Sequence, residues 1–184
     1  MLDRAIIDHA SPTLARLKLG NLFNYPITKG FCSEFIALRE ELRKKGVTLS
    51  ILRVAQGKAL IYVYRADALV NVLRNSNVQQ FLMSCGYHRF DAIGAIETLK
   101  ARLDGTDAFP HEIGIFLGYP LEDVLGFIEN GGRNCLTCGC WKVYSNESAA
   151  LTAFQRYSKC KAVYQRLFAS GCPLSRLTVA TRPA

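Results

Sequence analysis

The stretch VTLSILRVAQGKALIYVYR, Val47–Arg65, carries the clearest strand signal in the chain. Valine, leucine, isoleucine and tyrosine dominate both of its halves, and β-branched and aromatic residues favour strands. Gln56-Gly57 separates the halves, and a two-residue connection that contains glycine is typical of a hairpin turn. We therefore predict that Val47–Ala55 and Lys58–Arg65 pair as a β-hairpin.

Helical patterns surround this hairpin. Thr28–Lys45 has apolar residues at helical spacing and ends at Gly46. Leu2–Phe23 is predicted to be helical on both sides of a break, because Ser11-Pro12-Thr13 fits a helix start. Further helices are predicted at Ala66–Asn75, Val78–Cys85, Arg89–Leu103, Pro120–Asn130, Asn146–Ser170 and Ser175–Val179, and strands at His111–Leu117 and Cys140–Tyr144.

These elements predict an α+β fold. We expect a single domain over residues 1–184, with a small mixed sheet of about four strands surrounded by roughly six or more helices. The elements do not alternate as βαβ units, and neither G-x-G-x-x-G nor G-x-x-x-x-G-K-[ST] occurs. A dinucleotide-binding fold and a P-loop are therefore disfavoured.

The composition favours a globular protein, because 49% of the residues are hydrophobic. The first residues, MLDRAIIDHA, include Asp3, Arg4 and Asp8 and lack the apolar centre of a signal peptide. No window approaches the ~18 apolar residues of a membrane span. We expect a cytoplasmic location and no membrane partner, and the sequence leaves the oligomeric state open.

The net charge of +8 is concentrated near one end. From residue 131 onward there are eight lysines and arginines and a single acid, Glu147. Arg156, Lys159 and Arg166 fall on one side of the predicted helix there. Such a basic patch is either a solvated face or a contact for nucleic acid or another anionic partner. No known nucleic-acid motif accompanies it.

The seven cysteines are odd in number, which disfavours a disulfide framework in a reducing compartment. Cys135, Cys138 and Cys140 form C-x-x-C-x-C, and its first pair has the spacing of a zinc knuckle. A complete site needs about four ligands, so Cys160 or a histidine would have to complete it. The sequence thus offers a thiolate-bound metal as a candidate cofactor, with buried or reactive thiols as the alternatives.

His111 and Glu112 are adjacent candidates for acid/base catalysis. If their segment is a strand, the two side chains point to opposite faces. His111 then shares a face with Ile113 and Ile115, and Glu112 points to the face that Gly114 leaves open. No serine or cysteine nucleophile lies beside them in the sequence, and H-E-x-x-H is absent. A structural role is the simpler interpretation.

The turn Leu117–Asp123 contains Tyr119, a candidate ligand contact, and leads into a predicted helix. A turn of this kind can bind phosphate on free N–H groups. Pro120 removes one donor, however, and the carboxylates of Glu122 and Asp123 would repel an anion at the helix start. A self-capped helix is the better interpretation.

Trp141 and Lys142 are two further candidate ligand contacts. With Tyr144 they form an aromatic–basic–aromatic strand. Such a strand can stack a base or another flat ligand. It can equally cover the edge of a core, with the lysine head reaching water.

Three blocks carry a resemblance to a known family. They are His9–Ala15 with Lys18 and Leu22-Phe23; FPHEIGIFLGYPLEDVLGFIEN, Phe109–Asn130; and CGCWKVY, Cys138–Tyr144, with Tyr157, Lys159-Cys160, Tyr164 and Leu167-Phe168. They resemble the uncharacterised bacterial family catalogued as domain of unknown function 3793, whose members come largely from anaerobes. The resemblance implies no particular activity. Cys138 and Cys160 fit the family pattern, whereas Cys135 and Cys140 look particular to this chain, which weakens a metal site that needs all four.

The first of these blocks adds His9, Thr13 and Lys18 to the candidates. They lie around a predicted helix start, where Thr13 suits the helix terminus and Lys18 suits a solvated position. They can also line a pocket together with His111 and Glu112.

Three functional hypotheses follow. The first is a binding or accessory module for a small ligand or metal, in a cleft near His9, His111, Glu112 and the strand of Cys138. The second is an enzyme that uses His111 or Glu112 as acid/base or Cys138 as thiolate, which shifted groups converging in one pocket would favour. The third is a partner of nucleic acid or of an acidic protein, which binding that weakens steeply with salt would favour.

Overall fold

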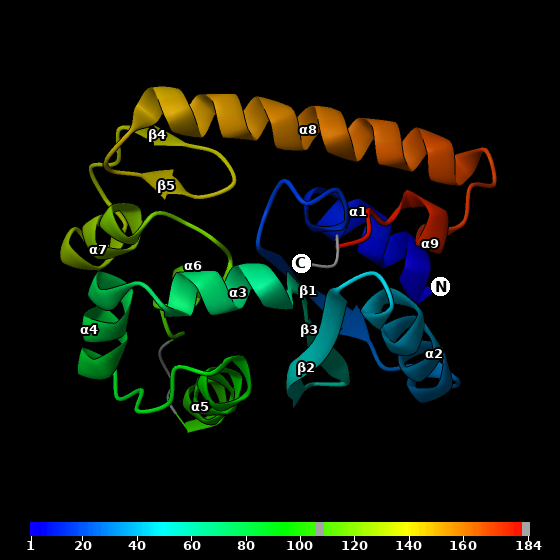
Figure 1. Cartoon of the computed structure of the whole chain (residues 1–184), viewed down its shortest axis with the longest axis horizontal. Coiled ribbons are helices and arrows are strands. Elements are labelled where there is room, and N and C mark those ends of the chain that lie inside the picture. The colour runs from blue at the N-terminus through cyan, green and yellow to red at the C-terminus, as the bar shows by residue number, and fades with distance from the viewer. Residues whose placement is uncertain (106–108, 182–184) are drawn as a thin grey trace. The chain divides into compact units, whose positions relative to one another are not determined.

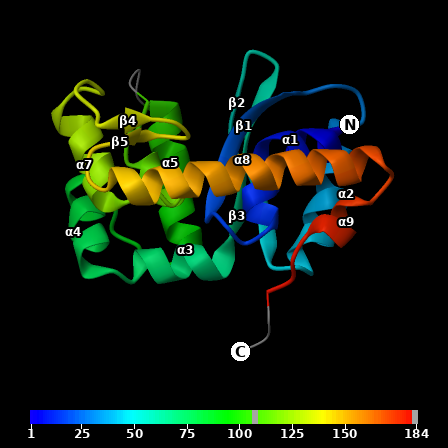
Figure 2. The same cartoon turned by 90° about the horizontal axis from the view of Figure 1, so that it is seen from above.

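The computed structural model describes residues 1–105 and 109–181 and has the expected α+β class. The chain forms two compact units. One combines Met1–Ala68 with the segment that starts at Lys159, and the other is Leu69–Ser158. Helix α3 (Ala66–Leu73) and helix α8 (Glu147–Ala169) each pass from one unit into the other (Figure 2).

The predicted hairpin is confirmed in the first unit. Strands β2 (Val47–Ala55) and β3 (Lys58–Arg65) are antiparallel, with a register shift between Ile51 and Arg53. Gln56 and Gly57 have positive φ angles of 51° and 70°, as a hairpin turn that matches the strand twist requires. Strand β1 (Gly20–Pro26) pairs with the other edge of β3, so β3 is the central strand (Figure 1).

The prediction for Leu2–Phe23 is wrong in two respects. Helix α1 (Leu2–Leu14) runs through Pro12 without a break, and the chain then forms strand β1. Pro12 lacks an amide donor and so removes one helical hydrogen bond, and the neighbouring Ser11 hydroxyl donates to the Ile7 carbonyl. Strand β1 has no strong signal of its own and is specified by its pairing with β3.

Helices cover the sheet of this unit. They are α1, α2 (Phe31–Arg43), the C-terminal part of α8, and α9 (Leu174–Leu177). Their apolar faces and the strands share one core, which includes Ile6 and Ile7 of α1, Ile61 and Val63 of β3, and Leu174 and Leu177 of α9.

A buried guanidinium joins these elements. Arg65 is only 2% exposed, and it donates to the carbonyl oxygens of Thr13 at 2.9 Å, Leu14 at 2.5 Å and Lys45 at 2.9 Å. Two of these carbonyls end helix α1, where the helix leaves acceptors unpaired. Burial lowers the pKa of Arg65 to about 10, so the side chain remains charged at neutral pH.

The second unit contains α4 (Ser76–Ser84), α5 (Ala92–Gly105), α6 (Ile113–Phe116), α7 (Leu121–Glu129), and a short hairpin of β4 (Thr137–Cys138) and β5 (Lys142–Val143). The helices predicted after the large hairpin are all present, with boundaries shifted by a few residues. The side chain of Asn146 accepts a hydrogen bond from the amide of Ala149, as predicted for the start of α8.

The strand predicted at His111–Leu117 is wrong, because this segment forms the short helix α6. Its residues Ile113–Leu117 are all buried, so the apolar run has no polar face from which a period can be read. The strands consequently form a three-stranded and a two-stranded antiparallel sheet, in place of the one mixed sheet of about four strands that we expected.

Among the helices of residues 1–105 and 109–181, none combines the length and the apolar character that crossing a bilayer requires.

Replacement of Arg65 by methionine tests the guanidinium. It removes one of the two donors of each of three carbonyl oxygens, which then keep only a backbone N–H. We expect the loss of these charge-assisted hydrogen bonds to lower the free energy of unfolding by roughly 3 kcal/mol. The control is Arg16→Met, which removes an exposed ion pair of 2.8 Å to Asp67 and should cost no more than about 1 kcal/mol. Urea titrations measure both, and equal losses would contradict the role given to Arg65.

Candidate functional site

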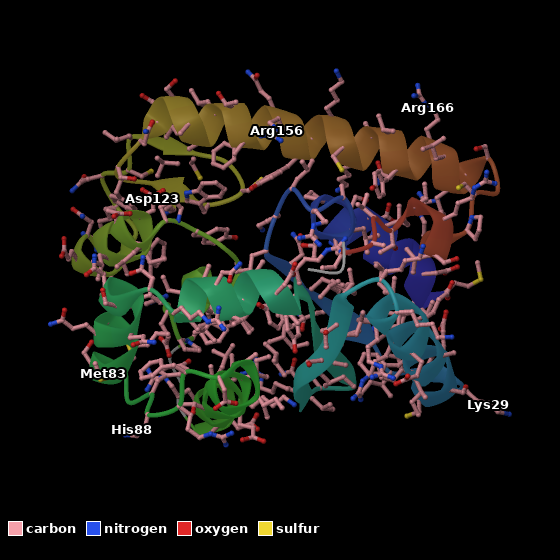
Figure 3. All side chains as sticks on the ribbon, in the orientation of Figure 1. Lys29, Met83, His88, Asp123, Arg156 and Arg166 are labelled. Carbon is pink, nitrogen blue, oxygen red and sulfur yellow. The ribbon has the colours of Figure 1, made fainter. Side chains whose placement is uncertain are left out.

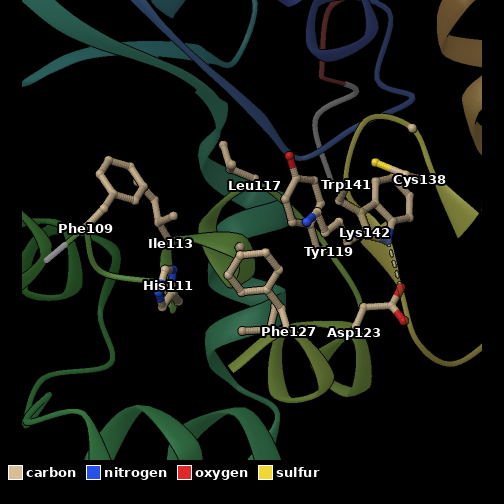
Figure 4. A pocket seen from close by; sticks show the side chains of 13 residues that line it. Phe109, His111, Ile113, Leu117, Tyr119, Asp123, Phe127, Cys138, Trp141 and Lys142 are labelled. Atoms are coloured by element: carbon tan, nitrogen blue, oxygen red, sulfur yellow. Dashed lines mark hydrogen bonds between the residues drawn. The ribbon is translucent and has the colours of Figure 1, made fainter. Parts of the chain in front are cut away.

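The second unit contains a cavity of about 430 Å³. Its walls come from α6, α7, the segment before α6, and the β4–β5 hairpin (Figure 4). Most of the lining is apolar or aromatic, with a small number of polar groups. The lining residues are Phe109, His111, Ile113, Gly114, Leu117, Tyr119, Asp123, Val124, Phe127, Cys138, Gly139, Trp141 and Lys142.

One side of the cavity depends on the close packing of α6 against α7. A Cβ atom added to Gly114 would lie 2.7 Å from Cγ2 of Val124, so a larger residue there would push the helices apart. The chain turns between the helices at Gly118, whose φ of 78° favours glycine. The amide of Tyr119 then donates to the Gly114 carbonyl at 2.9 Å. Gly114 and Gly118 thus allow α6 and α7 to pack closely against each other.

The opposite wall is an aromatic stack. The rings of Trp141 and Tyr119 lie 4.9 Å apart at 25°, and Phe154 of α8 meets the indole edge-on at 4.6 Å. The Tyr119 hydroxyl donates to the Cys140 carbonyl at 3.1 Å. Burial raises the pKa of Tyr119 to about 12, so the phenol stays neutral and can donate. Stacking and this hydrogen bond hold the hairpin against the α6–α7 turn.

Asp123 fixes the same wall through hydrogen bonds. Its Oδ2 accepts from Trp141 Nε1 at 2.7 Å (Figure 4). Its Oδ1 accepts from the amides of Tyr144 and Ser145 at 2.7 and 2.8 Å and from the Ser145 hydroxyl at 2.8 Å. Burial alone would raise the pKa of Asp123, but these hydrogen bonds outweigh it and lower the pKa. The carboxylate is therefore a buried, charged acceptor that joins α7 to the β4–β5 hairpin.

Lys142, His111 and Cys138 are the other polar groups of the lining. Lys142 Nζ donates to the Gly132 carbonyl at 2.6 Å and lies 5.9 Å from the centre of the Phe127 ring. The His111 ring contacts the same phenylalanine, with 5.0 Å between the ring centres. Cys138 is exposed and lies opposite Lys142 in the hairpin register. One thiol and two nitrogen groups thus join Asp123 in a lining that is mostly apolar or aromatic.

Glu112 does not line this cavity, contrary to the cleft that we expected around His111 and Glu112. It is 3% exposed and forms an ion pair with Arg102 of α5. It also accepts from the Tyr87 hydroxyl at 3.3 Å, and burial together with this carboxylate raises the pKa of Tyr87. The two side chains have different surroundings, as strand alternation predicted, but Glu112 contacts Arg102 and Tyr87 and does not share the open face of Gly114. The ion pair gives Glu112 a structural role.

His9, Thr13 and Lys18 belong to the other unit. His9 is exposed and stacks on Phe23 at 5.0 Å, and the Thr13 hydroxyl donates to Oδ1 of Asn21 at 2.8 Å. Lys18 is 9% exposed, although we expected it to suit a solvated position. None of the three lines the cavity of residues 109–142.

The cysteines are not gathered into a metal site. Cys138 and Cys140 are exposed, Cys135 is half-buried, and Cys160 is buried in α8. In residues 1–105 and 109–181, no group of three or more His, Cys, Asp or Glu side chains is placed to hold a metal ion. The four-thiolate arrangement suggested by C-x-x-C-x-C and Cys160 is therefore not present there.

The predicted basic patch lies on the observed helix α8. Arg156, Lys159 and Arg166 are all exposed, and the side chain of Arg166 extends away from the helix (Figure 3). Their half-buried neighbours Tyr157 and Tyr164 occupy other positions of the helix. The three positions that we predicted to form a basic side of the helix are thus exposed in the structure.

Comparison with known proteins gives the family. A family model described as a protein of unknown function, DUF3793, matches residues 6–178, nearly the whole chain. The chain belongs to the DUF3793 family. No curated protein and no solved structure matches it. The resemblance of the three sequence blocks is thereby confirmed.

The sequence pointed to five lining residues and missed others. His111, Tyr119, Cys138, Trp141 and Lys142 were candidates, and the structure brings them together. Apolar lining residues such as Phe109, Leu117 and Phe127 resemble ordinary core residues in sequence. Asp123 was assigned to the helix start alone. A signal for its second role was the Trp-Lys-Val-Tyr-Ser segment, whose indole and backbone donors need an acceptor.

Replacement of Asp123 by asparagine tests its role as an acceptor. An amide has one oxygen where the carboxylate has two, so at least one donor loses its partner, and we expect a loss of roughly 3 kcal/mol in the free energy of unfolding at neutral pH. The lowered pKa means that this stabilisation is present above the unfolded-state pKa of about 4 and lost as the pH falls through the folded-state pKa.

Urea titrations of wild type and Asp123→Asn across the acidic range measure this effect. The control is Glu122→Gln in the same helical turn, whose side chain is exposed. A difference between wild type and Asp123→Asn that is small at pH 7, or that grows on acidification, would contradict the assignment.

Proposed function

We propose that this protein is a binding module for a small hydrophobic ligand, which occupies the cavity between α6, α7 and the β4–β5 hairpin. The observation that carries the proposal is the lining: aromatic and aliphatic side chains surround about 430 Å³ of space, with only a few polar groups among them. Small-molecule sites in proteins have this size and composition.

The rigidity of the walls also supports a binding role. Tyr119 and Trp141 are stacked, and Asp123 holds the indole and the backbone that follows it. A wall that is fixed before binding needs little ordering when a ligand arrives, which favours affinity. An organic ligand is a better candidate than a metal, because the thiols and carboxylates of the described residues do not converge.

A binding role is preferred to the enzymatic alternative. Glu112 is ion-paired with Arg102, so it is not available as an acid/base partner for His111. Cys138 shares the cavity with His111, but among the described residues no hydrogen bond joins the two, as an activated cysteine nucleophile would require. The cavity therefore offers contacts to a ligand more clearly than a set of reacting groups.

Trp141 is the single tryptophan of the chain, so its fluorescence reports on this cavity alone. We expect para-bromobenzamide, a neutral flat probe, to bind saturably. Its bromine should quench the fluorescence of Trp141 on contact. Phe127→Ala should weaken this binding by about tenfold, because an aromatic contact is lost. Phe81→Ala, which changes a half-buried phenylalanine outside the lining, should leave it unchanged.

A crystal soaked with the probe locates the bromine by its anomalous scattering. A bromine within the cavity agrees with the proposal. Absence of saturable quenching by this probe and by its charged analogues would reject it. Native mass spectrometry of the protein purified without chelators complements this test, since a retained small molecule that Phe127→Ala releases would identify the natural ligand directly.

The basic side of α8 supports an alternative function in binding an anionic macromolecule. Arg156, Lys159 and Arg166 are exposed, and no carboxylate in the described part of the chain forms an ion pair with them. Exposed cations without partners are the electrostatic basis of nucleic-acid binding.

Charge reversal tests this alternative. If α8 binds nucleic acid, a fluorescent single-stranded oligonucleotide should bind with an affinity that falls steeply with salt. The double variant Lys159→Glu/Arg166→Glu should abolish the binding, whereas Lys29→Glu/Lys44→Glu, which reverses two charges elsewhere, should weaken it less. Binding that is absent at low salt, or is equal in both double variants, would reject the alternative.

A further inference from the structure

We propose that the ligand of this cavity is a hydrophobic monoanion, such as an aromatic carboxylate, whose anionic group binds Lys142. This inference rests on the proposed function and adds the charge and chemical class of the ligand. It follows from the charges of the described lining residues, among which Lys142 has no counter-ion and the carboxylate of Asp123 already accepts four hydrogen bonds.

Lys142 is a half-buried cation in an apolar surrounding. Its ammonium group donates to one acceptor, the Gly132 carbonyl, and lies over the face of Phe127. An ammonium has three N–H donors, and the contacts within residues 1–105 and 109–181 use one of them. Within the described residues no carboxylate forms an ion pair with Lys142. A partly buried charge of this kind is stabilised by an opposite charge that enters the same site.

Asp123 lines the same cavity but does not neutralise Lys142. Its carboxylate accepts four hydrogen bonds, from the Trp141 indole and from the backbone and hydroxyl groups that follow Val143. It is 2% exposed, so it offers almost no surface to a ligand. The negative charge of Asp123 is thus committed to the wall of the cavity, and among the described lining residues the accessible nitrogen donors belong to Lys142 and His111.

Phe127 connects these two donors. The His111 ring and the Lys142 ammonium both contact its aromatic ring, and both line the cavity. Figure 4 shows Phe127 among these residues, with Ile113 and Leu117 also lining the space. An anionic ligand can therefore place its charged group at Lys142 and its apolar body against the aromatic and aliphatic lining.

The positive charge of Lys142 argues against a site for a cationic ligand. Aromatic walls can bind quaternary ammonium ions through cation–π contacts. Here Lys142 already lies over one of the rings, and it would repel a second cation. The same aromatic lining therefore favours an anion.

Three probes of similar shape test the inference: para-bromobenzoate, para-bromobenzamide, and para-bromobenzyl-trimethylammonium, which are anionic, neutral and cationic. We expect the benzoate to bind the wild-type protein at least about tenfold more tightly than the amide, as a charge-assisted contact allows. We expect the ammonium probe to bind most weakly. Trp141 quenching and calorimetry measure the three affinities.

Variants of Lys142 assign the preference to its charge. Lys142→Met should remove the difference between benzoate and amide, and Lys142→Arg should retain it. The matched control is Lys100→Met, which removes a half-buried lysine of α5 outside the lining and should retain the preference for benzoate. If Lys142→Met does not fold, two other results test the role of the charge. The preference of the wild-type protein for benzoate should decline with salt, and Lys142→Arg should retain this preference.

The failures of the two proposals are distinguishable. If no probe binds in the cavity, the proposed binding function is rejected and this inference with it. If the amide binds as tightly as the benzoate, or the ammonium probe binds best, the binding function stands and the anionic class is rejected. A benzoate preference that Lys142→Met leaves intact also rejects the role of Lys142.

Discussion

The unit that carries the cavity depends on one buried carboxylate. Asp123 lies in the first turn of α7, and the donors that it accepts from lie about twenty residues further along the chain, in Trp141 just before β5 and in the two residues that follow β5. A hairpin of two-residue strands has too few ladder bonds to hold its own position. The orientation of Trp141, and with it one wall of the cavity, therefore follows from a side chain on a helix.

Sequence patterns predicted the elements whose information is local. The β2–β3 hairpin has strand-forming residues on both sides of a two-residue turn, and the helices have apolar residues at helical spacing. Two segments were assigned wrongly because their structure depends on contacts with distant parts of the chain. Ile113–Leu117 is buried on every side and so has no readable period, and Gly20–Pro26 becomes a strand because an edge of β3 accepts it.

The candidate site shows the same limit. Aromatic and basic residues such as Trp141 and Lys142 attract attention in a sequence, and both line the cavity. Which partners they meet depends on packing, as the opposite outcomes for the neighbours His111 and Glu112 show. His111 contacts Phe127 at the cavity, whereas Glu112 pairs with Arg102. Alternation along a strand already placed the two side chains on opposite faces, but it could not identify their partners, because Phe127 and Arg102 belong to other helices.

The order of the chain has a consequence for synthesis on the ribosome. The sheet unit is built from both ends of the chain, and Leu174 and Leu177 belong to its core, so residues 69–158 must be translated before that core can close. At about 5–20 residues per second, the nascent sheet waits for roughly 5–20 s with part of its apolar surface uncovered. The intervening unit has its own continuous segment of chain and can fold during this interval, ahead of the unit that begins before it.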